Sequence, residues 1–109
     1  MENCISFKNK KVTHIDFELY DGKVIKVGTP SKYTYDIMEN MDKKLKTCTV
    51  SNRDTIDDLY ELAALILSNN LAREEITVDY VSKQLDFDDL IILYNAYRDF
   101  VIQVKTNPN

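Results

Sequence analysis

Apolar positions near the end of the chain recur with the period of a helix. Over residues 86–105, which read DFDDLIILYNAYRDFVIQVK, a helical wheel of about 100° per residue gathers seven apolar side chains into one continuous stripe. The stripe consists of Leu90, Leu93, Tyr94, Tyr97, Phe100, Val101 and Val104. The pattern predicts an amphipathic helix that anchors a helical core.

Three large apolar residues of this predicted helix fall outside the stripe. Ile91, Ile92 and Ile102 lie on the side that also carries polar residues such as Asn95 and Arg98. A helix that docks once, within a monomer, does not require apolar side chains in so many directions. This surplus is the first indication that the protein acts by binding another molecule.

A second predicted helix, over residues 53–69, repeats the surplus. Its stripe consists of Ile56, Leu59, Tyr60, Ala63, Ile66 and Leu67, while Leu62 and Leu65 lie off it. Burial of one leucine or isoleucine side chain is worth roughly 1.5–3 kcal/mol, so the five surplus residues exposed together would form a strong association surface. The candidate partner-binding residues are therefore Leu62, Leu65, Ile91, Ile92, Arg98 and Ile102. The alternative, that the surplus residues pack against another helix of the same monomer, stays open.

Residues 4–27 have the alternation of a half-buried β-structure. Ile15, Phe17 and Leu19 alternate with acidic residues, and a further short strand is expected around residues 5–7. A two-residue Asp-Gly turn would mix the apolar and polar faces of the hairpin. A three-residue loop with Gly22 in the left-handed bulge position keeps the apolar face intact, and it predicts the pairs Leu19–Lys23, Phe17–Ile25 and Ile15–Val27.

Helices follow the hairpin. Thr29 as the capping residue and Pro30 at the first helical position predict a helix over residues 30–46. Its expected inward residues are Tyr33, Ile37, Met38, Met41 and Leu45. The second helix is expected to be capped by Ser51 or Asn52, the short helix with Val78, Val81 and Leu85 by Thr77, and the last helix by Asp86.

These elements predict one domain, residues 1–109, of the α+β, mostly α class. A β-hairpin segment (residues 1–28) packs on a helical body (residues 29–109) of about four helices. The chain of 109 residues is too short for two cores. Its longest apolar runs are far below the ~20 residues of a membrane span, and residues 1–10 lack a signal-peptide pattern. We therefore expect residence in a cytoplasm and no membrane partner.

The formal net charge of −4 is unevenly distributed. Residues 1–50 carry nine lysines and seven acidic residues, whereas residues 51–109 carry five basic and eleven acidic residues. The acidic half argues against nucleic acid as a partner, because phosphates would be repelled. Cys4 and Cys48 form neither a disulfide framework nor a metal motif, and two reduced thiols are expected.

Two acidic clusters are the obvious candidates for chemistry. Carboxylates as dense as those at residues 54–58 and 86–89 can hold Mg²⁺ or Ca²⁺. Both clusters coincide with predicted helix starts, where aspartate caps the helix and offsets its dipole, and neither has a glycine-bearing calcium loop. We therefore expect capping, no metal site and no cofactor. His14 beside Asp16 could be a general base, but a solvated strand histidine is the simpler interpretation. No nucleophile motif or phosphate-binding loop occurs, so no enzyme is expected.

The motifs of the C-terminal half resemble the tail assembly chaperones of long-tailed phages and prophages of Gram-positive bacteria. The resemblance rests on three features: a small acidic helical body after a short β segment, the helix start TVDYV at residues 77–81, and the closing sequence LDFDDLIILYNAYRDFVIQVKTNPN. The most specific part is the pattern L-D-x-D-D-L, then Y-x-x-F-(I/V), then P-N.

The resemblance implies a non-enzymatic role in the host cytoplasm. Proteins of this family bind the tape measure protein, a long apolar helical molecule, keep it soluble, aid polymerisation of the tail tube protein, and self-associate. On this basis the expected partners are the tape measure protein, the tail tube protein and further copies of the chain. Two rival hypotheses are a small regulatory or adaptor protein that binds a host or phage factor, and a metal-dependent enzyme built on the aspartate clusters.

Overall fold

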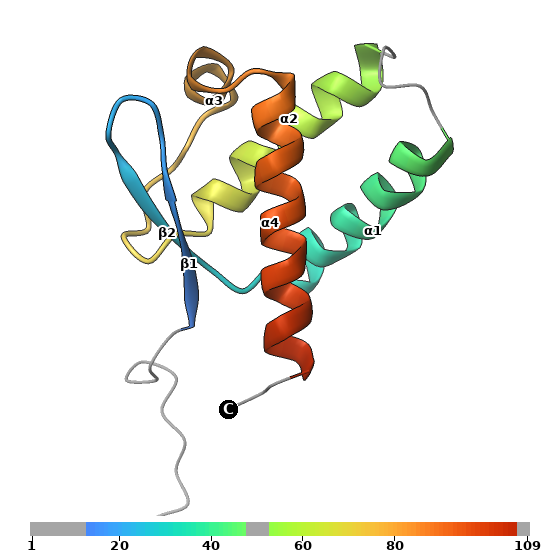
Figure 1. Ribbon diagram of the computed structural model, residues 1–109, viewed down its shortest axis with the longest axis horizontal. Coiled ribbons are helices and arrows are strands. Elements are labelled where there is room, and N and C mark those ends of the chain that lie inside the picture. The colour runs from blue at the N-terminus through green and yellow to red at the C-terminus, as the bar shows by residue number, and fades with distance from the viewer. Residues whose placement is uncertain (1–12, 48–52, 107–109) are drawn as a thin grey trace, which may run out of the picture.

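The computed structural model describes residues 13–47 and 53–106. A two-stranded hairpin precedes four helices (Figure 1), so the predicted class, α+β and mostly α, is confirmed. The elements are β1 (His14–Glu18), β2 (Val24–Gly28), α1 (Lys32–Thr47), α2 (Arg53–Ser68), α3 (Val78–Gln84) and α4 (Phe87–Thr106). The expected strand at residues 5–7, both cysteines and the proposed caps Ser51 and Asn52 lie outside the described residues.

The hairpin has the predicted register. β1 and β2 pair antiparallel, with Ile15 opposite Val27 and Phe17 opposite Ile25. The Leu19 N–H donates to the Lys23 carbonyl oxygen at 2.9 Å, and the Leu19 carbonyl oxygen accepts from the Gly22 N–H, also at 2.9 Å. Gly22 has φ +90°, the left-handed conformation that the bulge position of a three-residue loop requires. The apolar face of the hairpin is therefore continuous and packs against the helices.

The outer edge of β2 is covered by the segment that follows α2. The Gly28 N–H donates to the Asn69 carbonyl oxygen at 3.0 Å, and the Leu71 N–H donates to the Lys26 carbonyl oxygen at 2.9 Å. Asn70 also forms an antiparallel bridge with Val27. This third stretch of extended chain was not predicted, since residues 69–71 carry no strand pattern.

Helix α1 begins two residues later than predicted. Ser31 caps it, because the Ser31 hydroxyl accepts from the Thr34 N–H at 3.3 Å and the Ser31 carbonyl oxygen accepts from the Tyr35 N–H at 2.9 Å. Among the residues expected to face inward, Met38 and Met41 are buried, but Tyr33 is 69% exposed. The inward prediction for Tyr33 is wrong because the buried side of α1 is centred on Thr34, Met38 and Met41, and Tyr33 lies at the margin of that stripe.

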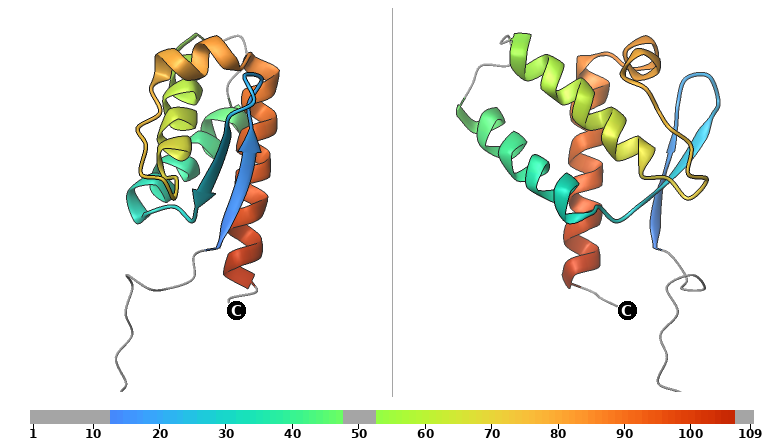
Figure 2. Two further views of the ribbon diagram at one scale, coloured as in Figure 1. Left: turned by 90° about the vertical axis from the view of Figure 1, so that its left-hand side faces the viewer. Right: turned by 180° about the vertical axis from the view of Figure 1, so that it is seen from behind.

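Helix α2 is the centre of the molecule. It contacts α1, α3, α4 and β2, and Figures 1 and 2 show α4 crossing one face of it, with α1 and α3 alongside. A helix with neighbours in several directions buries more than one stripe. Accordingly, the buried residues of α2 are Thr55, Leu59, Leu62, Ala63, Ala64, Ile66 and Leu67.

Helices α3 and α4 begin at the predicted caps. The Thr77 hydroxyl accepts from the Tyr80 N–H at 3.1 Å. Asp86 and Asp89 cap α4 reciprocally: the Asp89 N–H donates to the Asp86 carboxylate at 2.9 Å, and the Asp86 N–H donates to the Asp89 carboxylate at 3.1 Å. The two carboxylates therefore satisfy backbone donors at the start of α4.

Replacing Asp86 with alanine is expected to lower the free energy of unfolding by about 1 kcal/mol, the usual cost of losing a capping side chain. Urea denaturation followed by circular dichroism measures this loss. Asp86→Asn, which keeps a capping oxygen, is the control and should lose much less. Equal losses for the two variants would contradict the capping role.

Candidate partner-binding surface

The six candidate residues do not form one surface. Leu62 is only 2% exposed and belongs to the core, so its predicted place on an exposed surface is wrong. Ile91 is half-buried and packs against the same core. Both lie off the expected stripes because α2 and α4 are contacted from more than one side. For these two residues, packing within the monomer is the correct interpretation.

Ile92 and Ile102 are exposed on α4, which lies across the front of the molecule in Figure 1. Their exposed fractions are 66% and 51%. Ten residues of helix separate them, about 15 Å or nearly three turns, so both lie on the solvent side of α4. Exposed Asn95 and Asp99 lie between them. These two isoleucines are the part of the predicted surface that the fold leaves accessible.

Arg98 bridges two helices. Its Nη1 donates to the Asp42 carboxylate of α1 at 3.2 Å. The Tyr94 hydroxyl lies 2.6 Å from the same carboxylate and 2.8 Å from the Met38 carbonyl oxygen. Burial, followed by the hydrogen bond to Asp42, raises the pKa of Tyr94. Since α1 and α4 make no close backbone contact in the described part of the chain, these long side chains connect the two helices. Arg98 therefore helps to connect α1 and α4, in addition to being a candidate partner-binding residue.

Leu65 lines a groove of about 370 Å³ between α1 and α2. Tyr33 and Ile37 contribute further apolar surface, and Lys44 and Asp58, which form an ion pair across it, contribute polar surface. These α1 residues lie on the opposite side of the helix from Asp42, and therefore away from α4. Figure 2 shows α1 and α2 in front of α4 from behind. Leu65 is therefore separated from Ile92 and Ile102.

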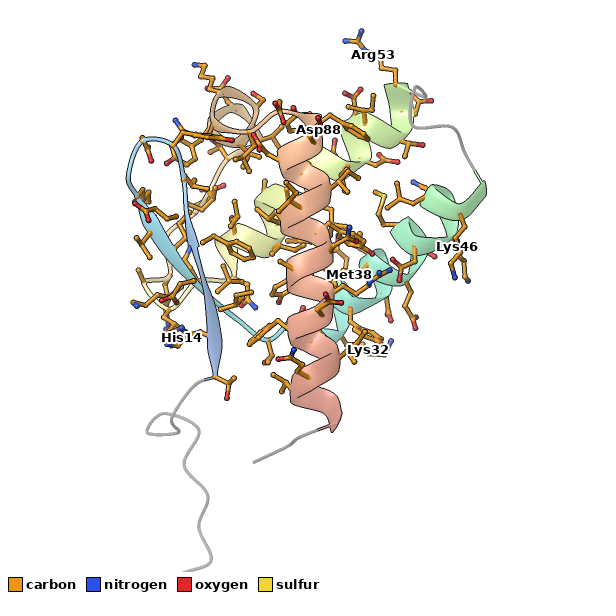
Figure 3. All side chains as sticks on the ribbon, in the orientation of Figure 1. His14, Lys32, Met38, Lys46, Arg53 and Asp88 are labelled. Atoms are coloured by element: carbon orange, nitrogen blue, oxygen red, sulfur yellow. The ribbon has the colours of Figure 1, made fainter. Side chains whose placement is uncertain are left out.

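Two separate hollows lie between β1 and α4. The upper part, of about 250 Å³, is lined by Phe17, Glu18, Leu19, Tyr20, Leu85, Asp89, Ile92 and Leu93. The lower part, of about 450 Å³, is lined by His14, Ile15, Asp16, Ala96, Asp99, Phe100 and Gln103. The strand and the helix run in opposite directions along them, and α4 contacts β1 directly. Figure 3 shows β1 beside α4, with His14 at the start of the strand. We call the two hollows together the β1–α4 groove.

The hairpin tip closes the upper end of this groove. The Tyr20 hydroxyl donates to the Asp89 carboxylate at 2.9 Å, and the Tyr80 hydroxyl of α3 donates to the Asp21 carboxylate at 2.6 Å. The backbone N–H of Asp86, followed by the Tyr20 hydroxyl, lowers the pKa of Asp89. The hairpin is thereby fixed to the starts of α3 and α4, and the β1–α4 groove has a defined shape.

The acidic clusters do not converge on a common centre. Asp86 and Asp89 cap α4, and Asp58 pairs with Lys44. The residues that the structure describes contain no group of three or more histidine, cysteine, aspartate or glutamate side chains that could hold a metal ion. His14 lies on exposed β1 and its Nδ1 is 2.8 Å from the Asp16 carboxylate, as expected for a solvated strand histidine.

Comparison with known proteins adds no relative. No family model, no curated protein and no solved structure matches this chain. Over residues 13–47 and 53–106, no helix is long and apolar enough to cross a membrane.

The sequence had indicated Ile92 and Ile102 as candidate partner-binding residues, but it had indicated neither groove. The groove between α1 and α2 had a signal in the sequence, because Tyr33 is a large apolar residue at the margin of the apolar stripe of α1. The β1–α4 groove had none, because it depends on tertiary contacts that no local pattern encodes.

Proposed function

We propose that the protein is a non-enzymatic tail assembly chaperone of a long-tailed phage or prophage. In this role it binds the tape measure protein in the host cytoplasm, keeps it soluble and aids polymerisation of the tail tube, and it self-associates. The observation that carries the proposal is the exposure of Ile92 and Ile102 on one side of α4. An apolar helix of the tape measure protein laid alongside α4 would contact both side chains, because they lie on the same side of α4, almost three turns apart.

The family-like motif of α4 has a structural role in this fold. Its residues Asp86 and Asp89 cap the helix, and Tyr97 and Val101 are buried. The motif therefore describes how α4 is capped and packed. Contact with a client falls to residues between and beyond the motif positions, and Ile92 and Ile102 are such residues.

The alternative is a small adaptor protein that binds a host or phage factor without solubilising it. The observation that favours this alternative is the β1–α4 groove, which is rimmed by the carboxylates of Glu18, Asp89 and Asp99. An acidic groove selects a charged partner segment, whereas a chaperone for an apolar client relies on exposed aliphatic side chains.

Co-expression of this chain with a phage tape measure gene, which the proposal places next to the gene for this chain, is expected to keep the tape measure protein soluble. The double variant Ile92→Asp/Ile102→Asp should lower the soluble fraction roughly tenfold or more, because two apolar contacts are lost and two charges are added. Soluble tape measure protein is quantified after centrifugation, and circular dichroism checks the fold. Ile91→Asp is unsuitable, since Ile91 packs against the core.

The matched control is Leu71→Asp/Val78→Asp. Leu71 and Val78 are exposed to 42% and 41% and lie outside α4, so this variant also removes two exposed apolar side chains and gains the same charge. It should solubilise the tape measure protein as the wild type does. Equal loss in both double variants, or full activity of the α4 variant, would refute the role of α4.

A further inference from the structure

The outer edge of β1 presents a row of backbone donors and acceptors. Because the Leu19 N–H donates to Lys23 across the hairpin, the alternation of an antiparallel ladder directs the backbone of Phe17 and Ile15 toward β2. The N–H and C=O groups of His14, Asp16 and Glu18 therefore point away from β2. Within the described ranges no hydrogen bond to these backbone groups is found. The opposite edge of the hairpin, by contrast, is covered by residues 69–71.

The open edge faces the β1–α4 groove. The groove follows the whole length of β1, and the side chains of Ala96 and Phe100 line its lower part. A row of unpaired backbone groups beside an apolar floor is the arrangement that accepts an additional strand. Five residues of extended chain, about 17 Å long, would span β1.

The charges around this edge select the partner. Glu18 of β1 and Asp99 of α4 are exposed, and no ion pair involves either of them within the described residues. Asp16 lies between them and shares its carboxylate with Lys26, at 3.3 Å on β2, and with His14. A strand added to this edge would meet mainly negative charge, so a basic segment is favoured.

The pleat of β1 defines how the partner alternates. Side chains opposite His14, Asp16 and Glu18 would lie on the solvent face, beside carboxylates, whereas those opposite Ile15 and Phe17 would lie on the face that turns to the core. The solvent-face positions suit lysine or arginine, and the core-face positions suit small or branched apolar residues above Ala96 and Phe100.

We propose that the β1–α4 groove binds an extended segment of another protein in which basic and apolar residues alternate, added as a third strand to β1. A second copy of the chain fits this edge less well, because the antiparallel pairing of β1 with itself about its centre places Asp16 opposite Asp16. Ile92 also lines the upper part of this groove, and Asp99 lies between Ile92 and Ile102 on α4, so the test uses Glu18 of β1, which the proposed tape measure contact does not require. Its outcome is thereby separable from that of the proposed function.

The test measures amide hydrogen exchange of the full chain by NMR with an acetylated eight-residue peptide of alternating lysine and valine. Binding is expected to slow exchange of the His14, Asp16 and Glu18 amides roughly tenfold or more, since these amides gain acceptors. The Ile15 and Phe17 amides, which point toward β2, should change little. The same peptide with alternate backbone nitrogens methylated, and a glutamate–valine peptide, should not bind.

Two matched variants test whether the carboxylate of Glu18 attracts the basic peptide. Glu18→Lys should weaken binding of the lysine–valine peptide roughly fivefold or more, whereas Glu39→Lys, with the same change in net charge on another surface, should retain it. Equal weakening by both variants, absence of binding, or binding without protection of the three β1 amides overturns the proposal. Protection of these amides that grows with protein concentration before peptide is added would overturn it in favour of a second copy.

Discussion

Replacing Leu62 with alanine is expected to lower the free energy of unfolding by about 2–5 kcal/mol. Leu62 is 2% exposed, and it lies in a helix that contacts α1, α3, α4 and β2. Truncation removes three carbon atoms from a site whose neighbours belong to several elements, so the structure cannot collapse fully into the space. A loss of this size is a large fraction of the stability of a single small domain.

Urea denaturation monitored by circular dichroism measures the effect. Ile92→Ala is the matched control, because it removes the same number of carbon atoms from a side chain that is 66% exposed. Its expected change is within about 0.5 kcal/mol. Similar losses in Leu62→Ala and Ile92→Ala would show that α2 is not the packed centre of the molecule. Comparison of the two variants therefore shows which of these apolar residues belongs to the core and which lies on the surface.

Raising the pH above 10 is expected to destabilise the protein. Burial raises the pKa of Tyr97 from 10.0 to about 12 and, with the Asp42 hydrogen bond, raises the pKa of Tyr94 as well. A group with a raised pKa in the folded state contributes stability that is complete below the unfolded pKa and is lost as the pH rises through the folded pKa. The loss therefore falls between about pH 10 and 12. Tyr97 alone accounts for on the order of 2–3 kcal/mol.

Ultraviolet absorbance of tyrosinate and circular dichroism, recorded together during titration, measure this effect. Tyr97→Phe should have a flatter dependence of stability on pH above 10, although at neutral pH it loses the 2.8 Å hydrogen bond to the Gly28 carbonyl oxygen. Tyr33→Phe is the control, since Tyr33 is 69% exposed, and its pH dependence should match the wild type. Ionisation of all tyrosines near pH 10 without loss of stability would contradict the burial of the Tyr94 and Tyr97 hydroxyls.

Local patterns predicted the elements and their ends well. The hairpin register followed from the requirement that Ile15 and Phe17 share a face with their partners, and Thr77 and Asp86 marked the true helix starts. Among the caps in the described residues, Thr29 was predicted in place of Ser31, because consecutive residues at this point of the sequence can each begin a helix. Such features depend on neighbours in the sequence, and the sequence therefore contains them.

The candidate surface was predicted less well, for a physical reason. A helical wheel shows how many apolar directions a helix has but not how many neighbours it will meet. In α2 the second direction is occupied by other helices, so Leu62 is buried, while in α4 it is partly open, so Ile92 and Ile102 are exposed. The β1–α4 groove and the cover over β2 depend on contacts between distant segments, which no window of the sequence displays.

The hydrogen bonds that join α4 to the hairpin span most of the chain. The Tyr20 hydroxyl reaches Asp89 and the Tyr97 hydroxyl reaches the Gly28 carbonyl oxygen, each across 69 residues. Because α4 follows the hairpin and the other helices along the chain, α2 lacks one of its packing partners until α4 has been synthesised. The hairpin and α2 can therefore complete their packing only after α4 is present, and closing these long loops is expected to slow folding.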